Sequence, residues 1–195
     1  MSQTFTINIP LGFTAPDFQL PDTVSGKLFN FNAIKSEKGT LVMFICNHCP
    51  YVLHVIKELV KISKEYESKG IGFVAISSND VNNYPEDSPE LMKQFAEDLH
   101  FSFPYLYDES QAIAKAYQAA CTPEYNLFDA NNHCVYRGQL DDSRPQNGSP
   151  VDGKHLRAAL DAVLKGEKPV EKQIPSSGCN IKWKNKAENS LKPLL

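Results

Sequence analysis

The 195-residue sequence lacks a basic cluster, a long apolar run and a regular set of cysteines. Its 20 Lys+Arg residues are balanced by 23 Asp+Glu residues, and the formal net charge is −3. Without a basic patch, binding to nucleic acid or to an anionic membrane surface has little support. No apolar stretch approaches the length of a signal peptide or a membrane span, and no basic residue precedes Lys27. We therefore expect a cytoplasmic protein with neither a nucleic-acid nor a membrane partner.

The five cysteines are odd in number and unevenly placed, which argues against the disulfide framework of a secreted protein. Such thiols pack, bind metal or react. A chain of this length with 42% hydrophobic residues fits one globular domain. We expect that domain to cover 1–167, with 168–195 as an irregular C-terminal arm packed on it, because prolines and Gly178 interrupt any periodicity there.

Hydrophobic patterning along the first half of the chain predicts a parallel strand–helix–strand unit. Alternating residues over 18–31 suggest a short hairpin. The apolar run 41–46 suits a strand buried on both faces, and Pro50 opens a helix whose apolar residues repeat up to Gly70. A second buried strand follows at 71–77. The connection should be a right-handed crossover, so the fold class is α/β.

The second half of the chain alternates shorter elements. We expect, in chain order, a helix over 88–99, a strand over 104–107, a small helix over 111–120, an antiparallel hairpin of 124–128 with 134–140, and a helix over 152–164.

The sharpest chemical signal is Cys46-Asn47-His48-Cys49, because it lies where the strand passes into the long helix. Two thiols at i and i+3 on the first helical turn can meet, and the unpaired N–H groups and dipole there favour a thiolate. We expect Cys46, nearer the strand end and more exposed, to be the nucleophile. Cys49 would then resolve the mixed disulfide.

Two alternatives accompany this motif. His48, when protonated, would stabilise the thiolate and make the disulfide more oxidising, or it is a solvated turn residue without a redox role. The cysteines could also be half of a zinc site, although no second Cys-x-x-Cys or His-x-x-x-His follows. We expect neither metal nor organic cofactor.

Thr122-Pro123, just before the strand at 124–128, is the second element. A cis proline there would orient the preceding backbone groups outward, whereas an ordinary trans proline would simply begin the strand.

Together these features resemble the thioredoxin-like superfamily. The segments Gly12-Phe-Thr-Ala-Pro-Asp-Phe-Gln-Leu20 and Tyr136-Arg-Gly-Gln-Leu-Asp141 are similar to the peroxiredoxin-like group that carries a thioredoxin-type dithiol. This resemblance implies a thioredoxin fold, a central mixed sheet flanked by helices. The expected fold has three additions: an N-terminal hairpin extension, a peroxiredoxin-type insertion over 79–120 and the irregular C-terminal arm. It also implies that Pro123 is cis beside the dithiol and that the Thr122 backbone pairs with an extended thiol substrate.

The sequence departs from peroxiredoxins at two positions. Cys49 falls where they place the thiol that attacks peroxide. They carry proline seven residues and threonine or serine three residues ahead of it, where this chain has Val42 and Cys46. The hydroxyl that would orient a peroxide is therefore replaced by a second thiol.

Other residues have weaker signals. Cys121 is either a third redox participant or a small buried residue, and Arg137 either adds positive potential near a substrate or is a surface residue of an edge strand. Cys134 should belong to the core. Cys179 either acts as a distant resolving thiol or anchors the arm, and anchoring is favoured.

We therefore predict a thiol–disulfide oxidoreductase that acts through Cys46 and Cys49. Its partners would be a protein or small-molecule disulfide or thiol and a thiol electron donor, and the sequence leaves a homodimer open. The alternatives are a thiol peroxidase acting on hydrogen peroxide or alkyl hydroperoxides, and a non-catalytic binding module.

Overall fold

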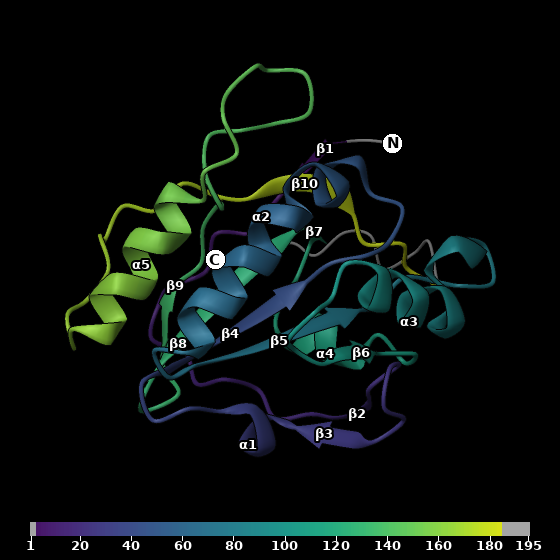
Figure 1. The fold of residues 1–195 in the computed structure, drawn as a ribbon, viewed down its shortest axis with the longest axis horizontal. Helices are drawn as coiled ribbons and strands as arrows, with labels where there is room; N and C mark the ends of the chain where they lie inside the picture. Colours follow the sequence, from purple (N-terminus) through teal and green to yellow (C-terminus); the bar gives the residue numbers. More distant parts are fainter. Residues whose placement is uncertain (1–2, 185–195) are drawn as a thin grey trace.

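The computed structural model describes residues 3–184 and centres on a five-stranded mixed sheet. The strand order is β6-β5-β4-β8-β9 (Figure 1). Its strands are β4 (Gly39–Phe44), β5 (Ile71–Ser77), β6 (Tyr105–Tyr107), β8 (Glu124–Asp129) and β9 (Cys134–Tyr136). β4, β5 and β6 run parallel, whereas β8 runs antiparallel to both β4 and β9. The expected crossover and closing hairpin are thus present, although β9 is shorter than expected.

Helices cover both faces of this sheet. Their bounds are α1 (Phe31–Ile34), α2 (Pro50–Glu67), α3 (Pro89–Asp98), α4 (Ala112–Ala116) and α5 (Lys154–Leu164), with a short 3₁₀ helix, η1 (Pro85–Asp87). α2, α3 and α5 contribute to one core cluster, and α1 and α4 to the other. The expected N-terminal hairpin is formed by β2 (Gln19–Pro21) and β3 (Leu28–Asn30) and packs on the second cluster.

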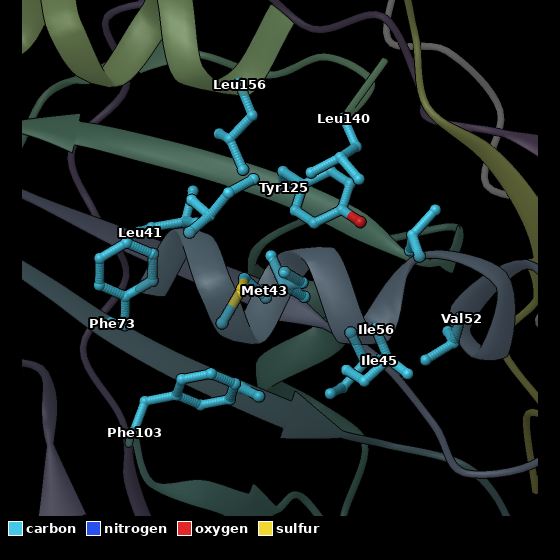
Figure 2. Close-up of a cluster of buried hydrophobic side chains, with 14 of the residues drawn as sticks. Leu41, Met43, Ile45, Val52, Ile56, Phe73, Phe103, Tyr125, Leu140 and Leu156 are labelled. Carbon is cyan, nitrogen blue, oxygen red and sulfur yellow. The ribbon is translucent and has the colours of Figure 1, made fainter. Parts of the chain in front are cut away.

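The two clusters follow from the alternation of side chains along a strand. In β4, Leu41 and Met43 face the first cluster, whereas Val42 and Phe44 face the second. Figure 2 shows part of the first cluster, including Leu41 and Met43 of β4 and Leu156 of α5. Because both faces of β4 are covered, its sequence is continuously apolar rather than alternating.

α2 forms the long amphipathic helix that the apolar spacing predicts. Cys49 is its N-cap and Pro50 its first residue, where a missing N–H costs nothing. The helix ends at Glu67, and Gly70 follows with φ +93°, a conformation that glycine adopts without strain. α2 therefore leads from the cysteine motif to the turn before β5, which begins at Ile71. It buries Val52 and Ile56 in its first two turns (Figure 2).

A three-stranded antiparallel sheet, β1-β10-β7, corrects the expectation of an irregular C-terminal arm. β1 (Gln3–Phe5), β10 (Ser177–Asn180) and β7 (Cys121–Thr122) come from distant parts of the chain. β10 lies between the other two strands and crosses beside the N-terminal end of α2 (Figure 1). The strand forms because both of its edges find partners, not because its Ser-Gly-Cys-Asn sequence favours β structure.

Within residues 3–184, none of the helices combines the length and the apolarity needed to cross a membrane. Residues 185–195 of the predicted arm lie outside the described residues.

Candidate active site

The register of β4 and β8 brings the cysteine motif to the Thr-Pro sequence. Phe44 pairs with Glu124 at the end of the antiparallel ladder. Continuing both strands by two residues places Cys46 opposite Thr122. The Thr122-Pro123 peptide bond is cis, which confirms that implication of the resemblance.

Both motif cysteines contact Thr122. Cys46 Sγ lies 3.3 Å from Thr122 Oγ1. Cys49 Sγ lies 3.2 Å from the Thr122 carbonyl oxygen, to which the protonated thiol donates. The two motif cysteines therefore contact the Thr122-Pro123 corner, as the resemblance implies.

A third sulfur, which the sequence did not place here, completes the cluster. Cys179 Sγ of β10 lies 2.8 Å from Cys49 Sγ, across 130 residues of sequence. The β10–β7 pairing positions it, because Cys179 is the register partner of Thr122. No spacing rule links these positions, so only the tertiary pairing of β10 reveals the contact.

All three sulfurs are buried. Cys46 is 1% exposed, Cys49 0% and Cys179 2%. The expected difference in exposure between Cys46 and Cys49 is therefore absent, because both thiols are buried. A substrate disulfide must therefore displace part of the structure to reach the sulfurs.

The electrostatics of the cluster favour a thiolate at Cys49. The pKa of Cys49 is lowered by hydrogen bonds from Cys179 and then Cys46, although burial opposes this. The pKa of Cys46 is raised by its interaction with Cys49 and by burial, and the pKa of Cys179 is raised for the same two reasons. Cys49, not Cys46, is at the N-terminus of α2, because Cys46 precedes the helix. The sequence predicts the lowered pKa at Cys46, whereas in the structure it falls on Cys49.

His48 forms an ion pair that sequence reasoning missed. Its Nδ1 lies 2.7 Å from Asp87 Oδ2, and its ring stacks on Tyr84. This contact raises the pKa of His48. Asp87 is fully buried and also accepts hydrogen bonds from the Asn47 N–H and the Asn79 amide. His48 is thus held in place, and the Asp87 charge offsets the positive charge that it brings to the thiols.

One set of side chains has the spacing for a metal ion. Ligand atoms of Cys46, His48 and Asp87 lie within 4.8 Å of one another. The Asp87 carboxylate already satisfies His48, Asn47 and Asn79, which accounts for its burial without a metal. We therefore interpret the group as an ion-pair and hydrogen-bond network.

β10 occupies the strand edge at which the resemblance implied substrate pairing. The Thr122 position of β7 is already paired with Cys179, and Cys121 is paired with Asn180. An extended substrate could pair with the Thr122 backbone only after β10 had moved away. The implied docking mode therefore does not apply to the structure as it stands.

The other two cysteines are buried. Hydrogen-bond partners of the Cys121 sulfur include Thr6 Oγ1 and Glu124 Oε2, each 3.8 Å away. Burial raises the pKa of Cys121 and also that of Cys134, which lies in the second core cluster. Both thiols have the surroundings of packed core residues.

Arg137 is not a surface residue, contrary to expectation. It is 6% exposed, and its guanidinium lies 2.6 Å from the buried Glu124 carboxylate. It also donates to Asn126 Oδ1 and to the Tyr117 carbonyl. Arg137 therefore pairs with a buried carboxylate, and its side chain is 2% exposed.

The geometry defines a thiol redox site on a thioredoxin-like α/β fold: a helix-capping cysteine, a second thiol three residues before it and a cis Thr-Pro corner. The family model described as Redoxin matches residues 10–153, and the chain belongs to the redoxin family. It is a thiol-based redox protein.

Solved structures agree with this placement. An uncharacterized conserved protein from Geobacillus kaustophilus is 56% identical, with a TM-score of 0.93 over 94% of this chain and 97% of that one. A hypothetical protein from Sinorhizobium meliloti is 47% identical, with a TM-score of 0.90 over 92% and 98%.

The thioredoxin domain of a thiol-disulfide oxidoreductase from Bacteroides vulgatus shares the fold, at 18% identity and a TM-score of 0.58 over 77% and 98% of the two chains. No curated protein matches the chain.

Proposed function

We propose that the protein is a thiol–disulfide oxidoreductase in which Cys49 attacks a substrate disulfide and Cys46 completes the exchange. The observation that supports this most directly is the position of Cys49 Sγ. It lies at the N-terminus of α2 and between two other thiols, and both features favour the thiolate. A thiol whose pKa is lowered supplies the thiolate that exchange requires as its attacking group.

The reaction has two displacement steps. The Cys49 thiolate attacks one sulfur of the substrate disulfide, forms a mixed disulfide and releases the first substrate thiolate. Cys46 then loses its proton and attacks Cys49 Sγ, which forms the Cys46–Cys49 disulfide and releases the second substrate thiolate. Two electrons pass to the substrate, and a thiol donor restores the dithiol. The Thr122 hydroxyl, 3.3 Å from Cys46 Sγ, orients the resolving thiol.

The substrate class follows from the cover over the site. Because β10 pairs with β7 and the sulfurs are at most 2% exposed, an extended polypeptide must displace more structure than a small molecule. We therefore place low-molecular-weight disulfides ahead of protein disulfides as substrates.

The test compares a small aliphatic disulfide with insulin, with dithiothreitol as the electron donor. We expect wild type to reduce the small disulfide faster and Cys49→Ser to abolish both activities. The matched control is Cys134→Ser, which changes an equally buried thiol of the other core cluster and should keep the activity. Full activity in Cys49→Ser would overturn the proposal.

Burial of the sulfurs favours a second candidate, a thiol peroxidase, because a hydroperoxide is small. The Cys49 thiolate would attack the peroxide oxygen and become a sulfenic acid as the alcohol or water leaves. A neighbouring thiol would then displace water and form a disulfide. Fast trapping of a sulfenic acid at Cys49, together with no reduction of either disulfide, would place this reaction first.

A further inference from the structure

Cys179 is a buried thiol that the exchange reaction described above does not use. It lies outside the Cys-x-x-Cys motif, yet its Sγ is 2.8 Å from the sulfur that we assign as the nucleophile. A cysteine that merely anchored the C-terminal segment would need no thiol beside it.

We propose that Cys179 is a third catalytic thiol, which attacks Cys49 Sγ and forms a Cys49–Cys179 disulfide. The proposal rests on the proposed function, because it needs Cys49 to carry the mixed disulfide. It adds a second resolving thiol to the site and makes Cys49 the sulfur that both resolving thiols share.

The position of Cys179 is held by backbone pairing on both sides. β10 is the middle strand of its sheet, where Cys179 pairs with Thr122 of β7 and with Gln3 of β1. A disulfide bond is about 2.05 Å long, so the two sulfurs, now separate thiols, need to approach by less than roughly 1 Å. No loop has to close before the bond can form.

Gly178 explains how β10 comes so close to the Thr-Pro corner. A Cβ atom at this position would lie 1.9 Å from the Thr122 carbonyl oxygen and 3.1 Å from Pro123 N. Any side chain would push the strand away from the corner. The glycine next to Cys179 therefore permits the contact between Cys179 and Cys49.

The chemistry balances in either of two ways. From the mixed disulfide of Cys49 with the substrate, Cys179 loses its proton, attacks Cys49 Sγ and releases the substrate thiolate, so the two thiols supply two electrons. From the Cys46–Cys49 disulfide, the same attack releases the Cys46 thiolate, and no net electrons move. In both cases the product ties β10 covalently to the N-terminus of α2 until a thiol donor reduces it.

The first experiment uses Cys46→Ser, which removes the motif partner. After one turnover with a small aliphatic disulfide in the absence of a donor, we expect peptide mapping without reduction to find Cys49 linked to Cys179. In Cys46→Ser/Cys179→Ser we expect the mixed disulfide between Cys49 and the substrate to be trapped instead.

A second variant tests the same contact through the backbone. Gly178→Ala should slow formation of the Cys49–Cys179 disulfide in the Cys46→Ser background by about tenfold or more, because the strand can no longer reach the corner. Ser177→Ala, a change of similar size in the same strand, should leave that rate within about threefold. Circular dichroism would verify that both variants fold.

The outcomes separate the two proposals. A mixed disulfide trapped in Cys46→Ser, with Cys179 still reduced, would overturn the role of Cys179 and leave the proposed function intact. Full disulfide reduction by Cys49→Ser would overturn the proposed function itself.

Discussion

Removing the guanidinium of Arg137 tests whether this residue serves the core or a substrate. Arg137→Met leaves the fully buried Glu124 without its ion-pair partner. Breaking a buried pair from one side costs about 3–5 kcal/mol of unfolding free energy. For a domain of this length, that loss lowers Tm by about 6–20 °C.

The assay is thermal unfolding followed by circular dichroism, with the disulfide-reduction rate measured per folded molecule. Arg157→Met is the control, since Arg157 pairs with Glu58 at a partly exposed site and should lose only about 0–1 kcal/mol. Replacing both Glu124 and Arg137 by Gln and Met should recover part of the loss, because no buried charge is left unpaired. An Arg137→Met protein that unfolds like wild type but fails to turn over substrate would refute this reasoning and restore the substrate-binding role.

The remaining predictions concern the surroundings of the thiols. His48→Gln should cost about 1–3 kcal/mol at acid pH, and less at alkaline pH, in chemical denaturation at several pH values. Asp87 raises the pKa of His48 in the folded state, so the ion pair adds fully to the unfolding free energy below the unfolded pKa of about 6.5. This contribution is lost as the pH rises through the folded-state pKa. An equal loss of stability at all pH values would contradict the ion pair. Metal analysis of protein purified without chelator should find no stoichiometric zinc, and bound zinc released together with activity would instead support a metal centre. Cys121→Ala should leave the exchange rate unchanged in the disulfide assay, and a large loss in a folded variant would show that this thiol takes part.

The local elements of the fold could be predicted because the signals lie within short windows. The apolar run of β4 and the period of α2 come from burial on a sheet and on one helix face. β10 gave no such signal, since its four residues are small or polar and its stability depends on partners at both edges. Short strands of this kind are determined by tertiary pairing.

The site divides in the same way. The motif and the Thr-Pro corner were visible because each is a contiguous pattern, and the β4–β8 register then brings them together. Cys179 could not be placed, because its neighbour is 130 residues away. The burial of Arg137 could have been anticipated from the expected hairpin, since Leu127 pairs with Tyr136 and this register places Arg137 close to Asn126.

The most direct test of the account is a pH titration of thiolate ultraviolet absorbance. In wild type we expect one thiolate that persists well below the ordinary range of a cysteine pKa, and its loss in Cys49→Ser but not in Cys134→Ser. Removing Cys179 should raise the pKa of the remaining thiolate, because Cys49 then loses a hydrogen-bond donor. An acid-stable thiolate that survives in Cys49→Ser and disappears in Cys46→Ser would contradict the account.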